Sequence, residues 1–177
     1  MIYEQLACLA ANTGFNAYAP LDISTIMLKT EVRDMCIANS CGKYGKNWSC
    51  PPGCGTLKEC EQNLKKFACG ILVQTVGEME DSYDFEAMME TEAVHRERFK
   101  KMYAALRKDG TGILALGSGC CSRCRDCTYP AKPCRFPEEM TSSMEAYGLL
   151  VSQVCKDNHL PYYYGPNKIA YIGCFLL

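Results

Sequence analysis

Residues 70–76 read GILVQTV and residues 112–118 read GILALGS. Both runs are short and rich in aliphatic side chains, a pattern that favours β-strands. Between them, apolar residues recur every three or four positions over residues 83–108, as they do on the buried face of an amphipathic helix. The whole stretch therefore predicts a strand–helix–strand unit at the centre of the fold.

Two more helices are expected beside this unit. Residues 56–68 read TLKECEQNLKKFA; the opening threonine can cap this helix, and its apolar residues share one face. Farther along the chain, Ser142 or Ser143 is expected to begin a helix that runs to about Asn158. Glu145 stands three residues after Ser142, which is the spacing of a capping box.

The C-terminal segment supplies the remaining strands. LPYYYG at residues 160–165 and IAYIGCFLL at residues 169–177 both have the length and composition of strands. The alternation of strands and helices predicts a single domain over residues 1–177, of the α/β or α+β class. We expect a central sheet of about four strands with flanking helices and two cysteine-rich loops.

Composition excludes several classes of function. The chain has 177 residues with a formal net charge of −1, so it lacks the basic excess of a nucleic-acid-binding protein. No apolar run approaches the roughly 18 residues of a membrane-spanning helix, so we expect no membrane partner either. The N-terminus, MIYEQLACLAANTG, has neither the basic region nor the cleavage site of a signal peptide. These features predict a cytoplasmic protein.

Cysteine is the outstanding component, with 14 residues in the chain. Dense disulfides are typical of small secreted domains that lack a core, whereas 48% of this chain is hydrophobic. In a reducing compartment, clustered thiols bind metal or react. The cysteine content therefore predicts metal binding in preference to disulfides.

The first group of cysteines lies in a loop rich in glycine and proline. Such residues let the chain turn sharply, so that several thiolates can converge on one metal centre. Arg33, Lys43 and Lys46 lie nearby and would offset the negative charge of the ligands. The alternative is that these cysteines are small buried apolar residues, as we expect for Cys60 on the apolar face of its helix. The candidate ligands are Cys36, Cys41, Cys50 and, as the natural fourth, Cys54.

The second group has the spacing C-x2-C-x2-C, followed by a fourth cysteine after six residues. The first three resemble the start of a bacterial ferredoxin motif. Zinc sites usually pair two separated C-x2-C units, so three cysteines at successive steps of three favour an iron–sulfur cluster. Adjacent Cys120 is a spare ligand, a reactive thiol or a core residue. The candidate ligands are Cys121, Cys124, Cys127 and Cys134.

Charged and titratable residues near these loops allow two interpretations. Basic residues around the second loop would offset cluster charge or receive an acidic redox partner, or they form a solvated surface. His95 falls on or beside the buried stripe of the long helix and is expected to be a core histidine. His159 is expected at a helix end, where a positive charge is favourable. The basic residues are Arg123, Arg125, Lys132 and Arg135.

The combined motifs resemble those of a bacterial and archaeal family of predicted metal-binding proteins. The pattern VR-x2-C-x4-C-x2-YG-x4-CPP spans Val32 to Pro52, and C-x2-C-x2-C-x6-CRFPE followed by SMEA-x-G spans Cys121 to Gly148. The resemblance implies no particular reaction, but it implies a prokaryotic and often anaerobic context. The family pattern has no counterpart of Cys54. The ligands it implies are Cys36, Cys41, Cys50, Cys121, Cys124, Cys127 and Cys134.

Three functions agree with these features. The first is an iron–sulfur protein that binds two [4Fe–4S] clusters and passes electrons to a partner enzyme. The second is an enzyme in which one cluster has three cysteine ligands, so that its open iron acts as a Lewis acid on a small-molecule substrate. The third is a structural or interaction module that binds zinc.

Overall fold

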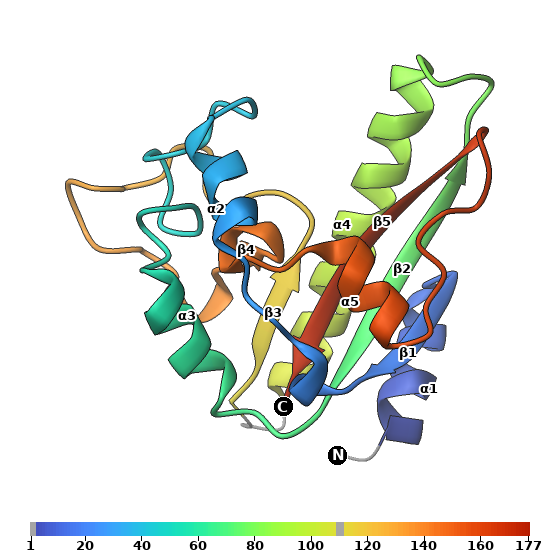
Figure 1. Ribbon diagram of the computed structural model, residues 1–177, viewed down its shortest axis with the longest axis horizontal. Coiled ribbons are helices and arrows are strands. Elements are labelled where there is room, and N and C mark those ends of the chain that lie inside the picture. Colours follow the sequence, from blue (N-terminus) through green and yellow to red (C-terminus); the bar gives the residue numbers. More distant parts are fainter. Residues whose placement is uncertain (1–2, 109–111) are drawn as a thin grey trace.

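The computed structural model describes residues 3–108 and 112–177, and it contains the expected strand–helix–strand unit (Figure 1). The unit comprises strand β2 (Gly70–Glu78), helix α4 (Phe85–Arg107) and strand β3 (Leu114–Gly117). Asp84 caps α4, because its carboxylate accepts a hydrogen bond of 3.0 Å from the Ala87 N–H. Among the described helices, none is both long and apolar enough to cross a membrane.

The sheet is mixed and has five strands in the order β1–β2–β5–β3–β4. Strand β5 (Lys168–Leu176) lies between β2 and β3 and is antiparallel to both. Strand β1 (Ala17–Leu21) pairs antiparallel with β2 at one edge, and the short β4 (Ser142–Ser143) pairs parallel with β3 at the other. The expected α+β class is confirmed, with one strand more than the sequence indicated.

Alternate residues of the strands supply two hydrophobic cores, one on each face of the sheet. On one face, α1 (Tyr3–Thr13) and α4 cover Ile71, Val73 and Phe175. On the other face, Leu72 and Cys174 pack with residues of helices α3 (Leu57–Leu64) and α5 (Val151–Asp157). The strands are thus buried on both faces, which explains why β2 and β5 read as nearly continuous apolar runs.

Helix α3 begins where the sequence predicts. The Thr56 Oγ1 accepts a hydrogen bond from the Glu59 N–H at 3.2 Å, and the Glu59 carboxylate accepts one from the Thr56 N–H at 2.7 Å. This reciprocal pair is a capping box. Cys60 is 2% exposed on the inner face, which confirms its expected place in the core.

The expected helix from Ser142 is wrong in its first two turns. Ser142 and Ser143 form β4 instead, because they pair with the end of β3. A 3₁₀ turn (Glu145–Tyr147) follows, and Gly148 ends it with a left-handed φ of +81°. Helix α5 begins only at Val151. Glu145 therefore does not form a capping box with Ser142.

The expected strand at residues 160–165 is also wrong. This segment has no regular structure and is held to the sheet by the side chain of Gln74. The Gln74 Nε2 donates to the Pro161 carbonyl at 2.9 Å, and the Tyr164 hydroxyl donates to the Gln74 Oε1 at 2.6 Å. Pro161 has no N–H to contribute to a ladder, and within the described residues the hydrogen bonds between this segment and the sheet go through the Gln74 side chain.

Three shorter elements complete the fold. Helix α2 (Thr30–Ile37) precedes the first cysteine loop, and 3₁₀ turns lie at Ile23–Thr25 and Pro137–Glu139. Figure 1 shows α2, α3 and both cysteine-rich loops together on one side of the sheet, away from α1. The fold thus places the two cysteine groups in one lobe.

Candidate metal centre

The first cysteine loop starts at the end of α2, which carries Cys36. Asn39 follows the helix with a left-handed φ of +56°, a conformation that asparagine tolerates better than most residues. Its side-chain Oδ1 accepts a hydrogen bond from the Tyr44 N–H at 3.0 Å. This turn brings Cys41 back towards the helix, and the chain then runs through Cys50 to the N-terminus of α3.

The second cysteine loop starts where β3 ends and runs to the 3₁₀ turn at Pro137–Glu139. Its centre closes on itself, because the Thr128 hydroxyl donates to the Pro133 carbonyl at 2.8 Å and the Lys132 N–H donates to the Thr128 carbonyl at 3.0 Å. The loop therefore has internal hydrogen bonds despite its lack of regular secondary structure.

Direct contacts join the two loops, although they lie about 70 residues apart in the chain. The Cys121 N–H donates to the Ser49 hydroxyl at 3.0 Å, and the Trp48 indole N–H donates to the Lys132 carbonyl at 3.0 Å. The Trp48 ring also meets Tyr129 edge to face, with 4.9 Å between ring centroids. Gly53 is required at this junction, because a Cβ there would lie 2.5 Å from the Asn47 carbonyl oxygen.

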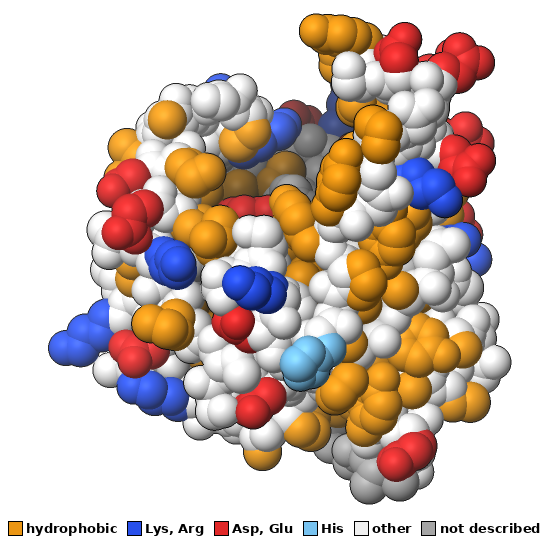
Figure 2. Space-filling model, turned by 45° about the vertical axis from the view of Figure 1, so that its right-hand side comes forward, with side chains coloured by type: hydrophobic (Ala, Val, Ile, Leu, Met, Phe, Trp, Pro, Cys, Tyr) orange, Lys and Arg blue, Asp and Glu red, His pale blue; other side chains and the backbone are white. Residues whose placement is uncertain are grey.

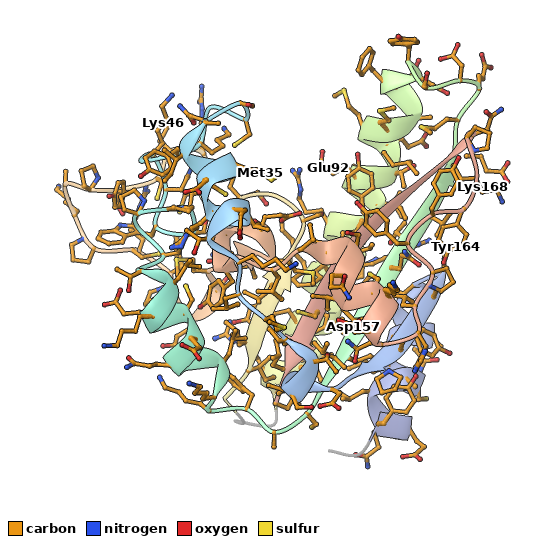
Figure 3. The ribbon with its side chains drawn as sticks, in the orientation of Figure 1. Met35, Lys46, Glu92, Asp157, Tyr164 and Lys168 are labelled. Carbon is orange, nitrogen blue, oxygen red and sulfur yellow. The ribbon has the colours of Figure 1, made fainter. Side chains whose placement is uncertain are left out.

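A cleft of about 480 Å³ separates the joined loops from α4, and we call it the cysteine cleft. Figure 2 shows the molecule hollowed between the projecting end of α4 and the neighbouring lobe. In Figure 3, Glu92 on α4 lies on one side of this hollow, across from α2. Glu92 and Arg96, which form an ion pair, line the α4 wall. The cysteines that line the cleft are Cys36, Cys41, Cys50, Cys120, Cys121 and Cys124.

A smaller cavity lies between the two loops, and we call it the cysteine pocket. All four candidate ligands of the second group line it, together with Trp48, Phe136 and Met140. Two of these ligands, Cys121 and Cys124, line the cysteine cleft as well. The second group is thus gathered around one cavity, which shares a wall with the cleft. The four cysteines are Cys121, Cys124, Cys127 and Cys134.

Cys54 lies close to the first group but does not line the cleft. Its Sγ is 3.6 Å from the Ala146 carbonyl oxygen, next to Cys36, whose Sγ is 4.0 Å from the Glu145 carbonyl oxygen. A hydrogen bond with the Cys60 thiol lowers the pKa of Cys54 to about 7. Cys54 therefore has thiolate character and contacts Ala146, a residue of the cleft wall, but it does not itself line the cleft.

Cys120 has a clearer place than the sequence could assign. It is half-buried, lines the cleft and forms a hydrogen bond with Cys50 that lowers the pKa of the Cys120 thiol to about 6. The same hydrogen bond raises the pKa of Cys50. Cys120 is thus neither a core residue nor remote from the first group. Cys120 lies three residues after the end of β3, and its hydrogen bond with Cys50 connects the two cysteine groups.

Arg33 supplies positive charge inside the first group. Its side chain is 8% exposed, and one Nη donates to the Gly55 carbonyl, whereas its Nε and other Nη have no partner among the described residues. Burial raises the pKa of Cys36, and the Arg33 guanidinium opposes part of that rise. A buried guanidinium with two unused donors fits an anionic sulfur ligand set, because such a set would supply the missing acceptors.

The thiols line cavity walls and do not converge on one point. Within residues 3–108 and 112–177, no three histidine, cysteine or acidic side chains are close enough to enclose a single metal ion as they stand. The described structure therefore brings the four candidate ligands of the second group to one cavity, and all candidates of the first group except Cys54 to another, without forming a closed mononuclear site. Their role as ligands stays a prediction.

Neither histidine takes part in the cleft or the pocket. His159 is exposed just after α5, where it adopts a left-handed φ of +58°. His95 is 1% exposed, and its Nδ1 lies 3.1 Å from the Thr75 hydroxyl. Its Nε2 is buried and has no hydrogen-bond partner among the described residues. His95 is thus a core histidine, as expected, but only half of its hydrogen-bonding capacity is used.

Mild acid is expected to destabilise the fold through His95. Burial lowers the pKa of His95 to about 4, from 6.5 in an unfolded chain. Between these values the unfolded state takes up a proton that the folded state does not, so stability present at pH 7 is lost as the pH falls. The loss should be about 2 kcal/mol at about pH 5. Urea unfolding at pH 7 and at about pH 5 measures this loss of unfolding free energy. The loss should be smaller for His95→Gln than for the unsubstituted protein, and equal losses in the two proteins would contradict this account.

The chain was compared with known families, curated proteins and solved structures. A family model described as "predicted metal-binding protein (DUF2284)" matches residues 19–177, a range that contains every cysteine except Cys8. No curated protein and no solved structure matches the chain. The matched range includes Val32–Pro52 and Cys121–Gly148, and the match confirms the resemblance to this family. The chain therefore belongs to the predicted metal-binding protein family DUF2284.

Proposed function

We propose that this protein binds two [4Fe–4S] clusters and transfers single electrons to a partner enzyme. The observation that carries the proposal is the shared wall of the two cysteine cavities. Cys121 and Cys124 line both, so a cluster held in the pocket would lie next to one held in the cleft. Neighbouring clusters give an electron a short path between them, which is the arrangement that an electron carrier needs.

The distribution of thiols favours clusters over zinc. A zinc ion needs four ligand atoms within about 2.3 Å of one point. A [4Fe–4S] cluster is larger, and each thiolate binds a different corner of it. The cleft of about 480 Å³, which Cys36, Cys41 and Cys50 line without converging on one point, has room for the larger group. The pocket has a volume of about 20 Å³ and would have to open around its cluster.

Positive charge around the cavities favours ionised thiols, whether they bind an iron–sulfur cluster or zinc. Arg33 is buried beside the first group, and Lys43, Arg96 and Arg125 line the cleft. These cations would stabilise ionised thiols and lower the net charge of a bound cluster.

The basic residues of the second loop divide into two sets. Arg123 forms an ion pair of 2.6 Å with Glu139 and stacks over Phe136, and Arg135 donates to the Asp126 carbonyl. These two stabilise the loop itself. Lys132 and Arg125 are exposed and make no ion pair within the described residues, so they are the ones available to an acidic redox partner.

A second candidate function is an enzyme in which the cleft cluster has three cysteine ligands and an open iron. The position of Cys54 favours it, because Cys54 contacts Cys60 and the Ala146 carbonyl and does not line the cleft. Cys36, Cys41 and Cys50 would then be the protein ligands, and a bound iron would act as a Lewis acid on a small-molecule substrate.

Anaerobic purification tests the proposal directly. Two [4Fe–4S] clusters predict about eight iron and about eight sulfide ions per chain, with broad visible absorption that fades on reduction. Stoichiometric zinc in a colourless protein would overturn the proposal in favour of a structural zinc module.

Substituting Cys54 or Cys120 separates the two candidate functions. If either thiol is the fourth ligand of the cleft cluster, its change to alanine should remove about four iron ions, which supports an electron carrier. If both variants keep about eight, the cleft cluster has an open iron and the enzyme is favoured. Iron and sulfide content, compared with Cys69→Ala at an exposed position, gives the result.

A further inference from the structure

A third cavity, of about 370 Å³, lies between α4 and the segment Gly117–Arg123. Its volume is within the range of small-molecule sites. Seven residues of α4, spaced as one face of the helix, line one wall; they are His95, Arg96, Phe99, Lys100, Tyr103, Ala104 and Arg107. Ser118, Ser122 and Thr141 contribute hydroxyl groups to the opposite side. We call it the cationic cavity.

The charge of this cavity is strongly positive, although the net charge of the chain is −1. Four cations line it, namely Arg96, Lys100, Arg107 and Arg123, against one carboxylate, Glu139. Glu139 pairs with Arg123, and Arg96 pairs with Glu92. In the part of the chain that the structure describes, Lys100 and Arg107 form no ion pair. Two uncompensated cations thus face a concave surface, where the field of a charge is strengthened.

His95 provides a second and independent indication of a ligand. It lines the same cavity, and its Nε2 is buried without a hydrogen-bond partner among the described residues. Buried polar atoms are nearly always paired, and leaving one unpaired is unfavourable. A polar group that reached this nitrogen from the cavity would satisfy it. Positive charge, hydroxyl groups and an unsatisfied imidazole therefore belong to the same cavity.

We propose that the cationic cavity binds a small molecule through a phosphate or carboxylate group. Lys100 and Arg107 would contact the oxyanion, and their charge-assisted hydrogen bonds would supply most of its affinity. Cys120 and Cys121 line both this cavity and the cysteine cleft. The bound molecule would therefore lie against the cysteines of the candidate metal centre. This inference goes beyond the proposed electron transfer and gives the centre a substrate class.

Calorimetric titration of the anaerobically purified full chain tests the inference. Inorganic phosphate and succinate serve as separate probes, so that the two oxyanions are distinguished. At least one should bind saturably, and Lys100→Gln combined with Arg107→Gln should weaken it by about tenfold or more. Both residues are exposed, so the double variant is expected to fold.

Lys101→Gln is the matched control, because Lys101 is an exposed neighbour that pairs with Glu97 at 2.6 Å and does not line the cavity. It should bind the probe as the unsubstituted protein does. The inference is overturned if neither probe binds saturably, or if Lys101→Gln weakens binding as much as the double variant. If unfolding shows that the double variant is destabilised, the single variant Lys100→Gln is used instead. Its affinity for the probe should be several-fold weaker than that of the unsubstituted protein.

The two proposals fail separately. Iron and sulfide are measured on the same samples before and after titration. A protein that keeps its clusters but binds neither probe contradicts only the cationic cavity. A protein that binds a probe but lacks iron contradicts only the iron–sulfur proposal.

Discussion

Changing Cys127 to alanine is expected to remove about half of the iron and sulfide, from about eight ions of each to about four. Cys127 lines the cysteine pocket but not the cysteine cleft. Loss of this thiolate should therefore release the pocket cluster and leave the cleft cluster in place. Iron and sulfide analysis with the visible spectrum of the anaerobic protein measures the effect.

The reciprocal change is Cys41→Ala, because Cys41 lines the cleft but not the pocket. It should also remove about four iron ions, and the double variant should remove about eight. Cys8→Ala is the control, since Cys8 is an exposed residue of α1 outside both cavities. Full iron content in Cys127→Ala would show that the second group is not a ligand set.

Much of the fold was predictable because its signals are local. The strand–helix–strand unit follows from apolar periodicity within about 50 consecutive residues. The capping box of Thr56 and Glu59 and the burial of Cys60 depend on neighbours within one helix. Such features need no knowledge of how distant segments pair.

The errors of prediction arise where distant segments meet. Ser142 and Ser143 have the local pattern of a helix start, but pairing with β3 makes them a strand. The insertion of β5 between β2 and β3 depends on pairing of the C-terminal segment with both. A short window of sequence carries no record of these long-range pairings.

In the candidate metal centre, too, local features were predictable from the sequence and long-range contacts were not. The spacing of Cys121, Cys124 and Cys127 predicts that they act together, and they line one pocket. The contact of Cys120 with Cys50 joins residues 70 positions apart, so spacing could not reveal it. The spacing of Cys54 favours a ligand, whereas its burial against Cys60 depends on the packing of α3.

The largest loss of stability is expected from Phe175→Ala. Phe175 is fully buried on β5, and its ring stacks on Phe99 of α4 with 4.4 Å between centroids. Gly173 makes this packing possible, because a Cβ there would lie 2.6 Å from the Phe99 ring. Phe175 therefore connects the central strand to the helix that forms one wall of both the cysteine cleft and the cationic cavity.

Removing this ring should lower the free energy of unfolding by about 3–5 kcal/mol, through lost burial and the cavity left behind. Phe85→Ala is the matched control, since Phe85 is 66% exposed at the start of α4 and should change stability by less than about 0.5 kcal/mol. Urea unfolding of both variants, each purified anaerobically with its metal retained, provides the comparison. A loss below about 1 kcal/mol for Phe175→Ala would mean that α4 does not depend on this contact. In that case the walls of the two cavities would have to be held in place by the loops alone, and the shared position of the cysteines and the cations would lose its structural basis.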